Sequence, residues 1–149
     1  MNERYLYRGK YAGRCKSFEE CWVFGDLVYL TREPHIHPQN NTTTVTDTDL
    51  AKILVMHPVV PDTVGQCTGL RDKNGMLVFE GDFIKFRSND HIYTVTWDGG
   101  DGRFLGVSGR KTTNDRYLVY ISDELRKYAE IAGNIHDTPE LLKEDNDVN

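Results

Sequence analysis

The sequence predicts a mainly β protein made of two small β lobes, with a short helix near the C-terminus. Two tight turns lie close together at residues 72–75 and 80–82, and they leave no room for a helix between them. Residues 92–97, IYTVTW, form the clearest strand because β-branched and aromatic side chains dominate them. We place the N-terminal lobe at residues 1–60 and the C-terminal lobe at 61–142.

The central stretch at residues 63–86, TVGQCTGLRDKNGMLVFEGDFIKF, is the most informative part of the chain. Its first turn follows from Asn74-Gly75, a pair that tolerates positive φ, and the apolar residues 76–79 then predict the second strand of a hairpin. Gly81 predicts another tight turn before a strand at 82–86. A strand that opens on Gly-Asp and leads into a short hairpin is common in SH3-like barrels.

Turn residues and apolar periodicity set the remaining elements. We predict further strands at residues 5–8, 22–30, 103–108, 117–121 and 131–135, with a bulge or kink at Gly25-Asp26. Residues 31–48 are rich in Pro, Asn and Thr and predict a polar loop or a mobile hairpin. Residues 50–57 fit a strand or a short helix, and we favour a buried strand.

Two short helices are predicted in the C-terminal lobe. The first covers residues 123–128, with Ser122 as its N-cap, acids first and bases last. The second begins at Thr138-Pro139, with Thr as N-cap and Pro at the first helical position.

Composition limits the class of protein. The 149 residues are 38% hydrophobic and 11% aromatic, which is enough to form a core. No apolar run approaches the roughly 18 residues that a membrane span needs, and we expect no membrane association. The net charge of −5 includes four acids in the last ten residues, and we expect the tail at 143–149 to fray. An acidic chain of this kind disfavours strong, non-specific nucleic-acid binding.

Several residues are of types that can bind a metal ion or act as a nucleophile. His35 and His37 are alternate residues, and a zinc site would need two more ligands, for which Cys15 and Cys21 are spaced too far apart. We expect no metal and no cofactor, and free thiols at Cys15, Cys21 and Cys67. No histidine lies near Cys67, so we expect a small buried residue there and not a nucleophile.

A binding surface is the remaining possibility. We expect the aromatic residues of the C-terminal lobe to lie mostly in its core, although one face of a small barrel can expose aromatic rings to bases or peptides. The candidate binding residues on such a face are Lys85, Arg87, Tyr93, Trp97 and Arg103.

Four segments resemble the YopX family, small proteins encoded mainly by bacteriophages and prophages. They are YRGK at residues 7–10, WVFGDLV at 22–28, the central stretch at 63–86, and IAGNIHDTPELL at 131–142, in the family's order over nearly the whole chain. The segments 31–48 and 99–116 match nothing diagnostic. The resemblance implies a mostly β protein with an SH3-like barrel in its C-terminal part, and it supplies no catalytic residue.

We therefore expect a non-catalytic interaction module that binds a host or phage protein in the cytoplasm of a bacterial cell. The alternative is a nucleic-acid-binding accessory factor that uses the barrel face. An enzyme is a third and less favoured reading, because no catalytic constellation is evident. The N-terminal strands are too few to bury a core alone, so a homo-oligomer is also possible.

Overall fold

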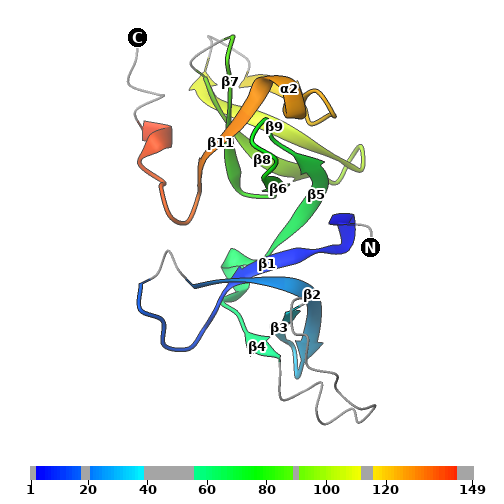
Figure 1. The fold of residues 1–149 in the computed structure, drawn as a ribbon, viewed down its shortest axis with the longest axis vertical. Coiled ribbons are helices and arrows are strands. Elements are labelled where there is room, and N and C mark those ends of the chain that lie inside the picture. The colour runs from blue at the N-terminus through cyan, green and yellow to red at the C-terminus, as the bar shows by residue number, and fades with distance from the viewer. Residues whose placement is uncertain (1–2, 18–20, 39–55, 89–90, 112–115, 144–149) are drawn as a thin grey trace. The chain divides into compact units, whose positions relative to one another are not determined.

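The computed structural model describes residues 3–17, 21–38, 56–88, 91–111 and 116–143, and it is mainly β (Figure 1). The chain divides into two compact units, Met1–Gln66 and Cys67–Asn149. The division falls inside strand β5 (Gly65–Arg71), whereas the sequence placed it after residue 60. None of the described helices is long and apolar enough to cross a membrane.

The N-terminal unit is an antiparallel sheet. Its strands are β1 (Tyr7–Lys10), β2 (Trp22–Leu30), β3 (Glu33–Pro38) and β4 (His57–Pro58), in the order β4-β3-β2-β1, with the start of β5 paired to β1. Two short 3-10 helices accompany them, η1 (Glu3–Tyr5) and η3 (Pro61–Thr63). The first predicted strand begins later than expected because η1 occupies its start.

Strand β2 runs through the middle of this sheet without interruption. Gly25 pairs with Tyr7 of β1 and with Pro38 of β3, and neither register shifts, so the predicted bulge at Gly25-Asp26 is wrong. A Cβ at residue 25 would overlap the backbone carbonyl of His37. Glycine is therefore needed here for close approach of β3, and not for a bend.

The predicted loop at 31–48 begins as a hairpin. Thr31 and Arg32 turn the chain with positive φ angles of 50° and 72°, and β3 follows directly. Of the two predicted alternatives, residues 33–38 therefore form a hairpin and not a loop, because β2 pairs with them along their whole length. Residues 39–48, and all of the segment 50–57 except Met56 and His57, lie outside the described residues.

The expectation of three free thiols is also wrong. Cys15 and Cys21 form a disulfide, with their Cα atoms 5.8 Å apart, and Cys67 is free and buried. The physical reason is the pairing of Lys10 with Trp22, because it returns the chain on itself and brings the ends of the intervening loop together.

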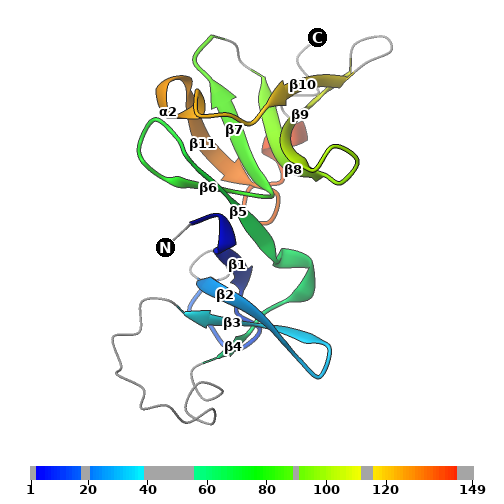
Figure 2. The same cartoon turned by 90° about the vertical axis from the view of Figure 1, so that its right-hand side faces the viewer.

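The C-terminal unit contains a five-stranded antiparallel sheet. Its strands are β7 (Asp82–Phe86), β8 (Ile92–Asp98), β9 (Arg103–Lys111), β10 (Arg116–Tyr120) and β11 (Ala129–Asn134), in the order β10-β9-β8-β7-β11 (Figure 2). The end of β5 pairs with β6 (Leu77–Phe79). These strands confirm the predicted ones to within a few residues. A closed SH3-like barrel is not seen, because no described pairing joins β10 to β11.

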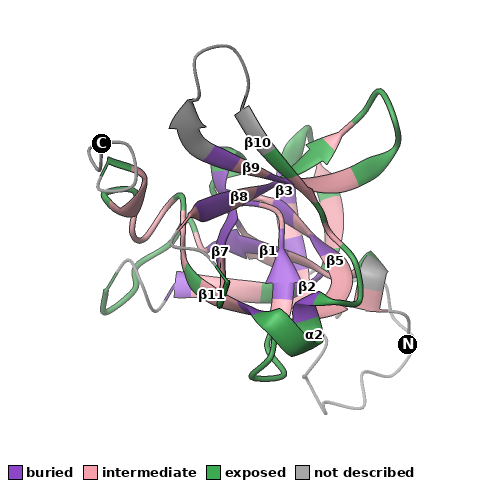
Figure 3. Ribbon diagram, turned by 90° about the horizontal axis from the view of Figure 1, so that it is seen from above, coloured by how far each residue is buried: buried purple, intermediate pink, exposed green. Residues whose placement is uncertain are grey.

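One hydrophobic cluster forms the core of this unit. Its buried members are Val78, Ile84, Tyr93, Val95, Leu125 and Ala129. They come from β6, β7, β8, the short helix α2 (Leu125–Tyr128) and β11, and Figure 3 shows buried residues along β7 and β8. The core therefore depends on bringing β11 and α2 back to the central strands.

Both predicted helices are present, but the cap predicted for the first is wrong. The N-cap of α2 is Glu124, which makes no side-chain cap hydrogen bond, and Ser122 contributes only its backbone carbonyl. At the C-terminus, Leu141–Lys143 are helical. Thr138 begins this turn, as predicted, because its carbonyl accepts a bond of 3.2 Å from the backbone N–H of Leu141. Its hydroxyl accepts a hydrogen bond of 3.0 Å from the backbone N–H of Asn134.

The buried carboxylate of Asp72 holds the central hairpin to the last strand. One oxygen accepts hydrogen bonds of 2.9 Å from the backbone N–H groups of Asn74 and Met76. The other accepts a bond of 3.0 Å from the N–H of Ile131, 59 residues away. Gly75 completes the turn at φ +79°, as the sequence predicted. One side chain thus closes a turn and anchors β11.

Replacing Asp72 with alanine should lower the free energy of unfolding by about 3 kcal/mol, because three backbone donors lose a charged acceptor. Urea unfolding followed by tryptophan fluorescence measures the change. The matched control is Asp62→Ala at an exposed aspartate, which should stay within about 0.5 kcal/mol of the parent. Equal stability of the two variants would contradict the role given to Asp72.

Reduction should release two more thiols than unfolding alone. Alkylation in denaturant without reductant should label Cys67 only, and prior reduction should expose all three cysteines, as read by intact mass. Because the bridge closes a short loop, Cys15→Ser should cost about 2 kcal/mol in stability. Labelling of three cysteines without reductant would show that the bridge does not form.

Candidate functional site

The five predicted binding residues do not share one exposed face. Tyr93 is only 4% exposed and lies in the core, opposite Ile84 and Ser108, which corrects its placement on a binding face. Trp97 is 40% exposed and its ring packs edge-to-face on Phe104, with centroids 4.9 Å apart. Alternation along the strand puts Trp97 on the same side of the sheet as Tyr93.

The two basic residues at the end of β7 lie far along the strands from Trp97 and Arg103, because Lys85 pairs with Ile92 at the start of β8 and Trp97 is near the end of that strand. Lys85 is half-buried and pairs with Glu130 on β11. Arg87 is exposed, and its backbone N–H donates to the carbonyl of Tyr128. Both residues therefore flank the β7–β11 side of the unit, whereas Trp97 and Arg103 belong to the β8–β9 hairpin.

Arg103 is already engaged by groups of its own unit. Its guanidinium lies 2.6 Å from a carboxylate oxygen of Asp101 and 3.9 Å from one of Asp98. The same guanidinium stacks over the ring of Tyr120, with its central carbon 4.6 Å from the ring centroid. Trp97 pairs with Phe104, which is next to Arg103 on β9. Because adjacent residues of a strand point to opposite faces, Arg103 and Trp97 lie on opposite sides of the sheet. Arg103 therefore orients Tyr120 and does not join Trp97 in a platform.

Strand β10 carries the two most exposed of the large apolar side chains among this sheet's described residues. Tyr120 is 67% exposed and Leu118 is 58% exposed. They pair with Leu105 and Val107 of β9, so both project from the same face. On its other side β10 has no partner among the described strands. An edge strand of this kind presents backbone N–H and C=O groups to a further strand.

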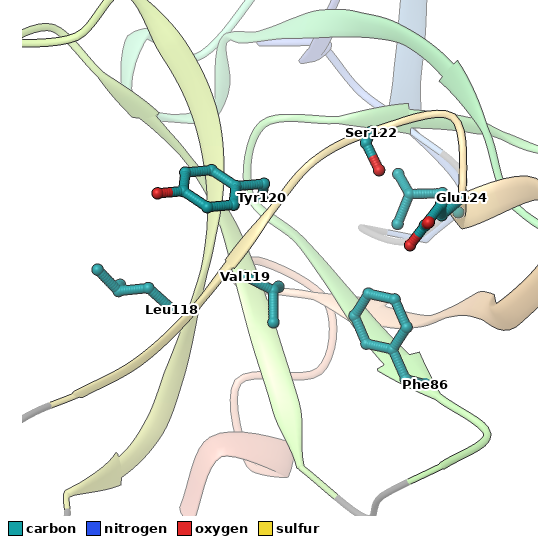
Figure 4. Close-up of a pocket in the computed structure, with 7 residues that line it drawn as sticks. Phe86, Leu118, Val119, Tyr120, Ser122 and Glu124 are labelled. Carbon is teal, nitrogen blue, oxygen red and sulfur yellow. The ribbon is translucent and has the colours of Figure 1, made fainter.

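A pocket of about 460 Å³ opens beside this edge (Figure 4). It is lined by Phe86, Leu118, Val119, Tyr120, Ser122, Glu124 and Leu125. Leu125 belongs to the hydrophobic core, and Phe86 and Val119 pack against it. The pocket therefore leads from the edge strand to the core, and Ser122 and Glu124 supply its polar lining.

A second cluster lies in the N-terminal unit, where the sequence suggested no site. Lys10 is fully buried, and its ammonium nitrogen lies 4.4 Å from the centroid of the Trp22 ring. The guanidinium carbon of Arg8 lies 4.5 Å from the same centroid. Pairing of β1 with β2 places Lys10 directly opposite Trp22. The sequence does contain a signal for this cluster: basic residues occupy alternate positions of one strand, and the next strand carries a tryptophan.

The residues considered for a metal site are separated. His35 and His37 lie on β3, and Cys15 and Cys21 are bonded to each other. Within the described ranges, no group of three His, Cys, Asp or Glu side chains could hold a metal ion. Cys67 is buried, and its sulfur accepts a bond of 3.4 Å from the backbone N–H of Gly69.

The geometry defines a mainly β protein of two units, one of which has an apolar pocket and an edge strand with no further partner among the described strands. The sequence profile described as YopX protein matches residues 18–143, and the chain belongs to this family. The match covers β2 to β11 and therefore reaches into both units. No curated protein matches the chain.

Replacing Trp22 with leucine should destabilise the protein by about 2 kcal/mol or more, because the two cations lose the aromatic face on which they stack. Tyr29→Leu, at an exposed tyrosine of the same strand, is the control and should cost less than about 0.5 kcal/mol. Thermal or urea unfolding measures both. If Trp22→Leu lowers the free energy of unfolding no more than Tyr29→Leu does, the stacking contributes nothing to stability.

Proposed function

We propose that the chain is a phage-encoded, non-catalytic interaction module that binds an extended segment of a host or phage protein along β10. One observation carries the proposal: an edge strand with two exposed apolar side chains, Leu118 and Tyr120, lies beside a pocket that leads to the core. An extended peptide can add to such an edge, with backbone hydrogen bonds for affinity and side-chain pockets for specificity.

The shape of the pocket supports this use of the C-terminal unit. Val119 on one edge strand lines it together with Leu125 of α2, which directly precedes the other edge strand, β11. The cavity therefore lies between β10 and the helix that leads into β11. We propose that the unit is an SH3-like barrel left open at this place, where a strand from a partner adds to it.

The surface favours a protein partner over nucleic acid. A phosphate-binding site needs available cations, whereas Arg103 is held by Asp98 and Asp101. The net charge of −5 acts in the same direction. Tyr93, the predicted stacking residue, is in the core. Nucleic-acid binding is therefore the weaker alternative.

Affinity capture from phage-infected bacterial lysate tests the proposal, with the full chain as bait and with nuclease treatment as a second arm. A stoichiometric protein partner should resist nuclease. It should fall by about tenfold or more with the double variant Leu118→Lys, Tyr120→Lys, because removal of central apolar contacts costs most of an interface's affinity. Both residues are exposed, so the variant should fold normally.

The matched control is Tyr29→Lys, an equally exposed tyrosine in the N-terminal unit, and it should capture the partner as the parent does. Equal capture by the β10 double variant would contradict the proposed surface. Partners that disappear after nuclease treatment would favour the nucleic-acid alternative.

A further inference from the structure

We infer that the pocket beside β10 selects its ligand by charge and position: it takes an apolar side chain of the bound segment and pairs a lysine or arginine two positions away with Glu124. This inference rests on the proposed function, since it assumes that a segment of another protein lies along β10. It adds the chemical class of that segment, which the open edge alone does not specify.

The apolar part of the recognition comes from the floor of the pocket. Phe86, Val119 and Leu125 line it, and the core lies behind them. A volume of about 460 Å³ is in the range of small-ligand sites, which span roughly 300–1,000 Å³. The space admits a large side chain such as Leu or Phe. Burial of that side chain against Phe86 would extend the existing core to the ligand.

The charged part comes from Glu124, which is exposed at the pocket and lies near Ser122 and Phe86 (Figure 4). Its carboxylate makes no hydrogen bond or ion pair with any described residue. Arg126, the nearest arginine in sequence, lies 3.4 Å from Asp123 instead. Glu124 is therefore an available anion beside an apolar cavity. A cation on the ligand complements it, and an acidic ligand is repelled.

The two contacts fix a spacing in the ligand. In an extended segment, successive side chains point to opposite faces, and residues two apart point to the same face. Figure 4 shows Val119, Phe86 and Glu124 on one side of β10, with Leu118 and Tyr120 on the other. The pocket floor and Glu124 therefore face the same side of a segment added to this edge. The preferred ligand therefore has an apolar residue and a basic residue separated by one position, in either order.

Selection of a displayed library of short random peptides on the purified full chain tests the inference. Enriched peptides should share an apolar residue with Lys or Arg two positions away. A synthetic peptide from this set, measured by fluorescence anisotropy, should bind about fivefold or more weakly to Glu124→Lys, because a favourable ion pair becomes a repulsion. Reselection on that variant should enrich Asp or Glu at the same offset.

The control is Glu140→Lys, which makes the same charge change at an exposed glutamate outside the pocket and should leave the affinity unchanged. Two results would overturn this inference and leave the proposed function standing. One is enrichment of peptides with no preference for Lys or Arg, and the other is an equal loss of peptide affinity in Glu124→Lys and Glu140→Lys. The Leu118→Lys, Tyr120→Lys variant should lose every selected peptide. If no peptide is enriched, or if β10 is occupied by a second copy in a dimer that this variant dissociates, the inference and the proposed partner both fail.

Discussion

The C-terminal unit depends on one buried carboxylate. Asp72 closes the turn between β5 and β6 and accepts a hydrogen bond from Ile131 of β11, while the neighbouring Lys73 donates its backbone N–H to Ala129. These bonds dock the last strand, and with it α2, against the strands that supply the core. Asp82 acts similarly at the next turn, because its buried carboxylate accepts a bond of 2.8 Å from Phe79. The central segment that carries the family resemblance thus has an architectural role.

Local sequence signals were sufficient to predict the turns and strands that depend only on neighbouring residues. Glycines 75 and 81 adopt the positive φ that their turns require, and the strand predicted at residues 92–97 is β8. Prediction was wrong where a distant segment decides the outcome. Gly25 is explained by the carbonyl of His37 on a neighbouring strand, which no local pattern reveals. The Ser122 cap likewise follows a sound rule, yet the helix begins later.

The candidate site was less predictable than the fold, and for a physical reason. Alternation shows which residues of a strand share a face, but it does not show which strand ends the sheet. The segment at 117–121 was recognised as a strand, and only the topology makes it an edge with Leu118 and Tyr120 exposed. The sequence also does not show which charges are compensated. Arg103 is a candidate cation from the sequence alone, but in the structure Asp98 and Asp101 lie beside it.

The open edge of β10 has a consequence for how the protein behaves in the cell. A strand with free backbone groups and apolar side chains is a template for indiscriminate pairing, including the stacking that leads to fibrils. Proteins normally protect such edges with proline, bulges or inward-pointing charge. The register of β10 shifts between Arg116 and Leu118, but residues 118–120, Leu-Val-Tyr, pair regularly with β9 and carry neither proline nor charge. The net charge of −5 opposes such pairing, because acidic chains repel one another. Under the proposed function, the bound segment would also keep copies of the chain apart by covering this edge.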